Sequence, residues 1–455
     1  MLTESEIKII KNCYMDYKSS YDHYDEINAY YYGNTDTLKN FKPMNGRSNL
    51  KVNTNFNQKL TDEEAQYSFG NSIKYTYKDD NDQASKDIKY HFKNNDADHD
   101  INLGIELIKN GLGYELSYLD EDLEFKNEII TPLEGYPYFD RGKLKYFLHI
   151  YSNQFDEKIY IDVYTNKMIY HLNSNFEEIK EPKLHPFGIV PVGVGKVGGK
   201  IYTKKRGYEE GDKTIHRTIK TLQDAYETNL SDMVSEISDF RNAILKLYGI
   251  ETEDETDSDG NVILDDNGNP KQKQPVIRGN AVLFLGDKKI EDAEWLIKNI
   301  NDVFIKNTRD DVKDLIYTLT SHIDSNEKMV SNLSGIALRS RLQNLEAKCS
   351  MNEKAMTNII RTRLKCLFQY LWTIKGVKYD SKLVHIEYTP KVPVDEATIA
   401  QIISQLPEGI VSKETFRSWI PRITDPIVEG EKVKKEQQED LKNELDLDKV
   451  VDVNE

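Results

Sequence analysis

The longest uninterrupted amphipathic pattern in this sequence lies between Ser334 and Lys375, and it predicts one continuous helix. Its apolar side chains recur every three or four residues in most places, the spacing of a helix with one buried face: Leu338, Leu342, Leu345, Cys349, Met356, Ile360, Leu364, Leu367 and Leu371. No proline or glycine interrupts the stretch after Gly335, and Gly376 stands where a capping glycine ends a helix. At ~1.5 Å per residue this helix is roughly 60 Å long, so it predicts a rigid support.

Two further stripes predict helices that precede the long one. The first begins at Asp212, a residue type that caps helix N-termini, and continues to Gly249. Its apolar positions keep a spacing of three or four residues: Ile215, Ile219, Leu222, Tyr226, Leu230, Met233, Ile237, Phe240, Ile244 and Leu247. The second covers Val303 to Ile323. A polar segment, Asp324 to Asn332, joins it to the long helix, and a loop held by rigid helices is a candidate functional element.

An acidic, turn-rich insertion separates these two helices. It runs from Glu251 to Pro275, and the turn signals Asp259-Gly260-Asn261 and Asn267-Gly268-Asn269 flank an apolar Val-Ile-Leu, which favours a hairpin-like excursion. Strands are expected at Ala281 to Leu285 and at Glu294 to Ile300. The acids fit a calcium-binding EF-hand loop poorly, because its first ligand position holds Glu and no bidentate Glu closes it. Whether the loop binds a cation stays open.

The N-terminal half predicts a mixture of helices and strands. Helices are expected for residues 1–32 and 52–69, followed by a short strand at 72–77. The charged stretch 78–100 carries no apolar period, and the spacing of its two histidines, His91 and His99, fits no standard metal site.

From Ile101 to about Val197 the pattern is one helix followed by a meander of strands rich in β-branched and aromatic residues. The fold class expected is therefore α+β. After Gly376 the sequence predicts a strand at residues 383–389 and short helices at Glu396 to Leu406 and Lys413 to Trp419. From Glu429 the tail is almost wholly charged and is expected to fray or to be disordered.

The composition limits the classes of function. With 455 residues the chain is long enough for several cores, and its mean hydropathy of -0.67 is that of a protein with much exposed surface. No run approaches the ~20 apolar residues of a membrane span, and the N-terminus shows no secretory signal. A net charge of -16 argues against a protein that grips nucleic acid over its general surface. The three cysteines are too few for a disulfide framework and indicate a reducing compartment.

A glycine-rich run offers the one pattern of a nucleotide site. Gly193, Gly195 and Gly198 follow the G-x-G-x-x-G spacing after an apolar run. A dinucleotide site needs a helix to start there, and the short, broken segment that follows does not predict one. The run is expected to be a flexible strap between domains. With no catalytic triad, metal spacing or phosphate loop, we expect no enzyme activity, no catalytic residue, no cofactor and no metal site.

A set of short motifs, taken in order, resembles the portal proteins of tailed bacteriophages, specifically the SPP1-like portal family. The residues that carry the resemblance are spread over more than half of the chain: Tyr31, Tyr32, Gly33, Asn57, Lys59, Tyr67, Phe69, Gly70, Ile73, Gly111 to Glu115, Ile130 to Glu134, His185 to Gly188, Val190, Pro191, Asp224 to Tyr226, Ser231, Asn332 to Leu338, Leu345 and Glu346. The glycine- and lysine-rich run after Pro191 departs from the family pattern, which tends to carry an asparagine-containing link there.

The resemblance implies a multi-domain portal architecture. On that pattern the parts would be a wing (1–211 and 334–394), a stem of two helices (212–249 and 302–323), a β-containing clip (250–301), a tunnel loop (324–333) and an α-helical crown with a charged tail (395–455). It also implies a homododecameric ring at one capsid vertex of a virion assembled in the host cytoplasm, with double-stranded DNA passing through its channel during packaging and ejection. The partners implied are the terminase motor, a head–tail adaptor, the major capsid protein and the scaffolding protein, with no membrane.

Two sets of candidate site residues follow. Lys328 is the one basic residue of the tunnel loop, so Lys328 with Asn326 and Met329 is expected to face DNA. The carboxylates of the clip are expected to meet the partner proteins: Glu251, Glu253, Asp254, Asp257 and Asp259. Two alternatives stand beside this hypothesis, another ring-forming tail or baseplate protein and an enzyme that binds a nucleotide at the glycine run.

Overall fold

A computed structural model shows the α+β class that the sequence predicts. It describes residues 2–42, 48–78, 82–93, 98–197, 213–239, 244–248, 254–265, 268–271, 292–296, 302–324, 335–389, 405, 412–420, 423 and 428–439. The chain separates into two units, Met1–Thr389 and Pro390–Glu455. Among the described helices, none has an apolar stretch that could cross a bilayer.

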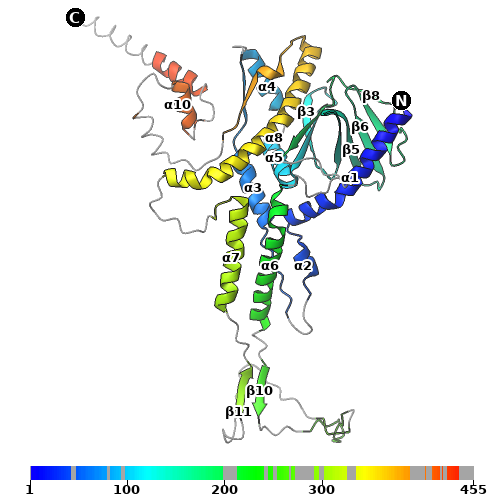
Figure 1. Ribbon diagram of the computed structural model, residues 1–455, viewed down its shortest axis with the longest axis vertical. Coiled ribbons are helices and arrows are strands. Elements are labelled where there is room, and N and C mark those ends of the chain that lie inside the picture. The colour runs from blue at the N-terminus through cyan, green and yellow to red at the C-terminus, as the bar shows by residue number, and fades with distance from the viewer. Residues whose placement is uncertain are drawn as a thin grey trace, which may run out of the picture. The chain divides into compact units, whose positions relative to one another are not determined.

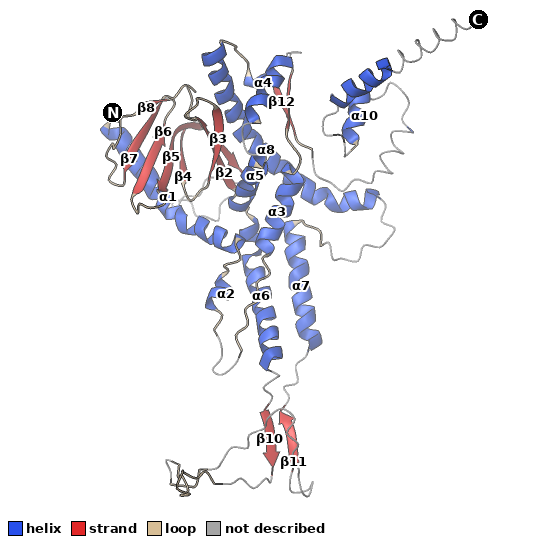
Figure 2. Ribbon diagram, turned by 180° about the vertical axis from the view of Figure 1, so that it is seen from behind, coloured by secondary structure: helices blue, strands red, loops and turns tan. Residues whose placement is uncertain are grey.

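The first element of unit 1, α1 (Glu4–Tyr31), covers one face of a five-stranded antiparallel sheet (Figure 2). Thr3 caps this helix in a capping box with Glu6. The strands follow one another in the sheet in sequence order: β4 (Gly135–Asp140), β5 (Lys143–Ser152), β6 (Ile159–Tyr164), β7 (Met168–Asn173) and β8 (Lys183–Leu184). Ile10 and Tyr14 of α1 pack on Leu148, Ile161 and Val163, so the predicted meander is confirmed.

A three-stranded antiparallel sheet, with the order β3-β2-β9, stands against the long helix α8 (Gly335–Lys375). Its strands are β2 (Leu112–Leu119), β3 (Phe125–Ile130) and β9 (Val192–Lys196). The bounds of α8 agree with the helix predicted from its apolar stripe.

The flexible glycine strap predicted after Pro191 is wrong in its described part. Gly193 and Gly195 lie inside β9, paired with Glu115 and Gly113 of β2. A Cβ atom on Gly193 would lie 2.8 Å from the Cγ2 of Ile359 and 2.9 Å from its backbone. The glycines therefore let a strand approach a helix closely. A dinucleotide fold would need the glycines after a parallel strand, and β9 is antiparallel.

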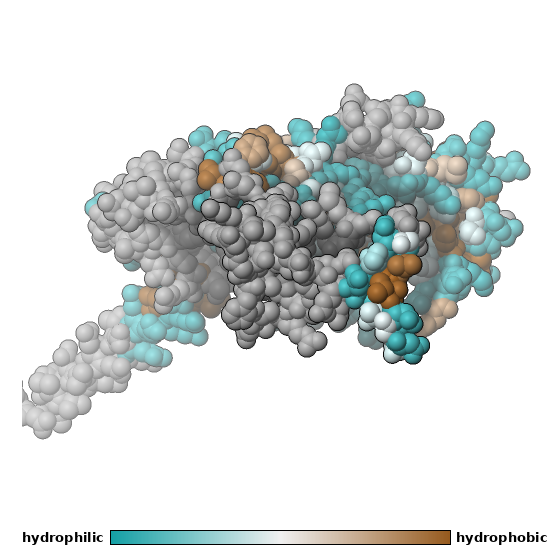
Figure 3. All heavy atoms as spheres, turned by 90° about the horizontal axis from the view of Figure 1, so that it is seen from below, coloured by the Kyte–Doolittle hydropathy of each residue, from teal (hydrophilic) through white to brown (hydrophobic). Residues whose placement is uncertain are grey.

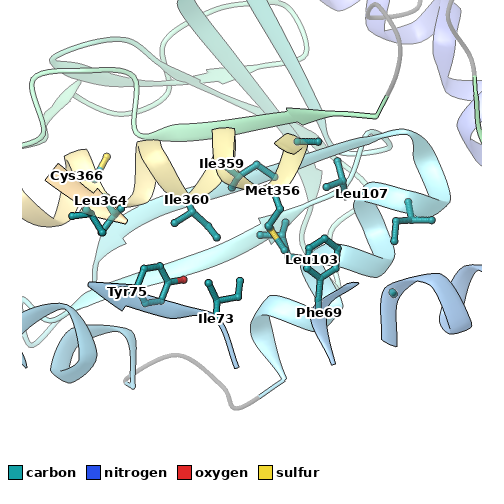
Figure 4. Packing of buried hydrophobic residues seen from close by; sticks show 14 of the residues in the cluster. Phe69, Ile73, Tyr75, Leu103, Leu107, Met356, Ile359, Ile360, Leu364 and Cys366 are labelled. Carbon is teal, nitrogen blue, oxygen red and sulfur yellow. The ribbon is translucent and has the colours of Figure 1, made fainter. Parts of the chain in front are cut away.

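The main core of unit 1 forms around α8 (Figure 4). Helices α3 (Phe56–Phe69) and α5 (His99–Asn110) pack on it, beside the strand pair β1 (Lys74–Tyr77) and β12 (Val384–Glu387). Between them lie the side chains that Figure 4 labels: Phe69, Ile73, Tyr75, Leu103, Leu107, Met356, Ile359, Ile360, Leu364 and Cys366. The charged stretch without an apolar period contains α4 (Asp82–Phe92), which buries Ala84 and Ile88.

A buried ionic cluster joins α8 to the three-stranded sheet. Arg363 of α8 donates from Nε and from one terminal nitrogen to the carboxylate of Glu115, at 2.9 and 2.5 Å, and a terminal nitrogen also donates to Asp100 at 2.7 Å. His99 Nε2 lies 2.7 Å from the same Glu115 carboxylate. Burial alone would raise the pKa of Glu115, but Arg363 and His99 outweigh it and hold this pKa at about 2.

Unit 2 contains α10 (Lys413–Trp419), capped by Ser412, at the predicted bounds. Residues 428–439 are also helical, so the expected disorder from Glu429 is wrong for this part of the tail. The predicted helix at 396–406 lies outside the described residues, apart from residue 405.

The replacement Arg363→Met tests the ionic cluster. It leaves the carboxylate of Glu115 buried without its guanidinium partner, so we expect the free energy of unfolding in urea to fall by about 3–5 kcal/mol. Lys365→Met on the exposed side of the same helix is the control, with an expected change within about 0.5 kcal/mol. Adding Glu115→Gln to Arg363→Met should restore part of the loss, and equal stability of wild type and Arg363→Met would contradict the assignment.

Candidate functional site

Two helices of unit 1 form an antiparallel pair that carries the insertion (Figure 1). They are α6 (Ile215–Asp239) and α7 (Asp302–Thr320), joined at the same end to the antiparallel strands β10 (Ile244–Tyr248) and β11 (Asp292–Leu296). The predicted helix to Gly249 is therefore too long. Ile244 and Leu247, counted in its apolar stripe, belong to β10, where backbone pairing with β11 overrides the helical spacing. The strand predicted at 281–285 lies outside the described residues.

One face of α6 binds an extended stretch of backbone through polar side chains at every fourth position. The amide N–H of Leu50 donates to Ser235 Oγ at 3.0 Å, and that of Val52 donates to Ser231 Oγ at 3.0 Å. Further along, the amides of Thr54 and Asn57 donate to Glu227 Oε1 and Gln223 Oε1, at 3.1 and 3.2 Å. We call Gln223, Glu227, Ser231 and Ser235 the polar ladder; it ties the segment before α3 to α6.

Glu227 is the central group of the polar ladder and is fully buried. Its carboxylate also accepts hydrogen bonds from the hydroxyls of Thr35, at 2.6 Å, and Thr54, at 3.2 Å, and from the amide of Gln223, at 3.1 Å. All of these donors are neutral. A buried carboxylate is stable only when hydrogen bonds replace its water, so Glu227 holds the three segments that supply them together.

The far end of α7 is anchored by a second buried cluster. His322, just after α7, places Nε2 3.0 Å from the carbonyl of Leu60 on α3 and Nδ1 3.0 Å from the carbonyl of Thr320. Burial and the neighbouring Lys348 lower the pKa of His322. Lys348 and Asn352 of α8 both donate to the buried Glu64 of α3 at 2.6 Å. These contacts hold α3, α7 and α8 together where residues 325–334 begin.

The candidate DNA-facing residues Asn326, Lys328 and Met329 lie outside the described residues. The structure describes the chain up to Asp324, whose carboxylate forms an ion pair with Lys313 of α7. The described chain resumes at Gly335, where α8 begins.

The described part of the insertion contains two turns of the same design, eight residues apart. Asp257 Oδ1 accepts from the backbone N–H groups of Asp259 and Asn261, and Asp265 Oδ1 accepts from that of Asn269. Each turn contains a glycine with positive φ, Gly260 and Gly268. These backbone hydrogen bonds lower the pKa of Asp257.

The backbones of the two turns are tied together. Ile263 N donates to the carbonyl of Glu255, Lys271 N to that of Ile263, and Glu255 N to that of Lys271, at 2.8, 2.7 and 2.6 Å. The Val-Ile-Leu between the turns is partly exposed, with Leu264 at 58%. Figure 3 shows the molecule from below, with small patches of hydrophobic residues (brown) beside hydrophilic ones (teal). The described residues 254–265 and 268–271 thus form a small unit that is held by its own backbone hydrogen bonds.

The structure describes three of the five predicted docking carboxylates. Asp254, Asp257 and Asp259 lie on the exposed surface of the insertion, whereas Glu251 and Glu253 lie outside the described residues. Asp257 shapes a turn as well. Within the described ranges no group of three or more His, Cys, Asp or Glu residues is arranged to hold a metal ion.

The apolar pattern of the sequence does not predict the polar ladder, because a helix is recognised by its apolar stripe. Its signal is present all the same: Gln223, Glu227, Ser231 and Ser235 recur at intervals of four residues, beside the apolar stripe that faces the core. The eight-residue spacing of the two aspartate turns was also available from the sequence.

The sequence matches the family described as "Phage portal protein, SPP1 Gp6-like" over residues 10–443. The chain therefore belongs to a class of structural proteins, the phage portals of capsid vertices. The chain is a member of the SPP1 Gp6-like portal family, as its short motifs predicted. No curated protein matches the sequence.

The solved structures that match this chain include chains of gene transfer agent (GTA) particles. A chain of the neck of the empty GTA particle, computed with C6 symmetry, has 9% identity and a TM-score of 0.46, and the match covers 80% of this chain and 88% of that chain. A chain of the native GTA virion has 10% identity and a TM-score of 0.42, with 80% and 87% covered. A chain of the native neck with C12 symmetry has 9% identity and a TM-score of 0.41, with 80% and 88% covered.

The replacement Glu227→Gln tests the polar ladder. It substitutes an amide for an acceptor that serves several donors, and hydrogen bonds to a charged group contribute about 1.5–3 kcal/mol. We expect hydrogen exchange at the amides of Leu50, Val52 and Thr54 to quicken at least several-fold, measured by mass spectrometry. Asp311→Asn, an exposed carboxylate of α7, is the control and should leave these amides unchanged. Unchanged exchange in Glu227→Gln would show that the ladder does not hold the segment.

Proposed function

We propose that this chain assembles into a dodecameric ring at one capsid vertex, with an axial channel through which double-stranded DNA enters during packaging and leaves during ejection. The observation that carries the proposal is the antiparallel pair α6–α7 with β10, β11 and the insertion at one end, in a chain matched to the portal family over residues 10–443. A long pair of helices can line a channel, and the insertion at its end can bind partner proteins.

The charge of the pair fits passage without adhesion. α6 contains five carboxylates, of which Glu227 is buried, against Arg217 and Lys220, and α7 contains four against three lysine or arginine residues. Clustered basic residues bind DNA phosphates tightly and in a salt-dependent way. A wall with an excess of carboxylates avoids such contacts, so a polyanion can slide along it.

The pattern of the portal family suggests a role for each part of the chain. Residues 1–211 and 334–394 act as the wing, 212–249 and 302–323 as the stem, 250–301 as the clip, 324–333 as the tunnel loop and 395–455 as the crown. The clip docks the terminase motor during packaging and a head–tail adaptor afterwards. Its exposed Val262, Ile263 and Leu264, flanked by Asp254, Asp257 and Asp259, offer an apolar contact with a charged rim. The wing meets the major capsid and scaffolding proteins during assembly in the host cytoplasm.

Electron microscopy of the purified protein tests the ring. End views should show twelve-fold rings, a number taken from the portal architecture, with a central hole wide enough for duplex DNA. Deleting residues 257–269 should abolish binding of the terminase and leave the rings intact, because this projection lies outside the core clusters. Binding of the terminase by the deleted form would remove the docking role, and a persistent monomer would refute the proposal.

The replacement Lys328→Glu tests the tunnel loop. A cation repeated around the ring contacts phosphate, so reversal of its charge should shorten the packaged DNA, measured by gel electrophoresis of DNA from purified particles. Lys365→Glu, at an exposed position of α8 outside the proposed channel wall, is the matched charge reversal and should leave the DNA length unchanged. If Lys328→Glu particles hold DNA of full length, Lys328 does not act on DNA.

A further inference from the structure

One face of α7 exposes leucines. Leu315 is 48% exposed and Leu319 55%, while Ile316, Tyr317 and Thr320 are buried. At about 100° per residue, Leu315 and Leu319 lie on the same face of the helix, and the three buried residues lie across from it. Exposed leucines at adjacent turns mark an apolar contact surface.

Between Arg217 and Asp232, the exposed face of α6 is made of short side chains. Thr218, Thr221 and Ala225 are exposed there, and Thr228 is partly buried on the same side. This face is distinct from the polar ladder and from the apolar stripe of the helix. Short side chains leave a shallow groove along a helix, which accepts bulky side chains of another helix.

The heights of the two surfaces match. Phe56 contacts the rings of Tyr226 on α6 and Tyr317 on α7, with centroids 5.2 and 6.2 Å away, so these tyrosines lie close together where the two helices pack. The helices are antiparallel, so, counted from these tyrosines, Leu319 lies toward the turn of Ala225 and Leu315 toward the turn of Thr228.

We infer that Leu315 and Leu319 of one subunit pack into the Thr221–Ala225–Thr228 groove on α6 of the next subunit. The inference rests on the proposed ring. In a ring the two sides of an interface are different surfaces of the chain, and rotation about an axis parallel to the helix pair keeps every residue at its height. The large side chains of one surface then meet the small ones of the other.

The other positions for these leucines are less favourable. A leucine face in the channel would expose apolar surface to water and to a polyanion, at a cost of about 25 cal/mol per Å². A two-fold contact of α7 with α7 would leave the groove of α6 uncovered and would not close a ring.

Disulfide cross-linking tests the packing. The double variant Thr228→Cys/Leu315→Cys, assembled and oxidised with copper phenanthroline, should form covalent multimers up to the full ring on a non-reducing gel. An equal mixture of the two single variants should give cross-linked dimers. The native Cys13, Cys349 and Cys366 are buried, so oxidised wild type should stay monomeric. Arg217→Cys/Leu315→Cys is the matched control, because Arg217 lies about three turns from Thr228 on the same face.

The outcomes separate this inference from the proposed function. If Thr228→Cys/Leu315→Cys forms rings in electron micrographs but runs as a monomer on the non-reducing gel after oxidation, the proposed packing is wrong and the ring is not. A disulfide within one chain, seen as a faster-migrating monomer, would also overturn it, as would ready labelling of Leu315→Cys by a maleimide in assembled rings. Failure of the wild type to form rings would refute the proposed function itself.

Discussion

Burial of α8 is the constraint on which unit 1 depends. Its apolar residues form the main core with α3, α5 and β1, and its closest approach to β9 is possible only because Gly193 and Gly195 carry no side chain. Within this apolar contact, Arg363 reaches Glu115 and Asp100 and defines how α8 sits on the sheet. Apolar burial is non-directional, whereas a buried ion pair is satisfied in few arrangements.

The helix α6 shows how one element serves several contacts. Its apolar stripe packs with α7 and the core, and its polar ladder binds the backbone of residues 50–57. A third face exposes the short side chains of Thr218, Thr221 and Ala225. A polar attachment positions the bound segment through hydrogen-bond geometry, with little apolar burial. The pair α6–α7 is therefore held firmly at the end near α3, through Phe56, His322 and Glu227, and carries the insertion at its other end.

Long apolar stripes predict helix bounds better than short ones. The stripe of α8 predicted its bounds, because a long helix with one buried face repeats its signal many times. The end of α6 was predicted too far along, since Ile244 and Leu247 continue the helical spacing while their backbone pairs in β10. The charged stretch containing α4 and the charged residues 428–439 are helical without a long apolar stripe. Periodicity reports burial, so it is weak where a helix buries few residues.

The family was evident from short motifs in order, and the match over residues 10–443 confirmed it. The sequence by itself determined the helices with strong stripes, the meander of strands, the two aspartate turns and the portal class, because these follow from local spacing and residue type. Only the tertiary structure decided that Gly193 and Gly195 form a strand against α8, that Glu227 holds separate segments, and that Tyr226 and Tyr317 both contact Phe56. Each of these depends on groups far apart in the chain meeting in space, which local spacing does not encode.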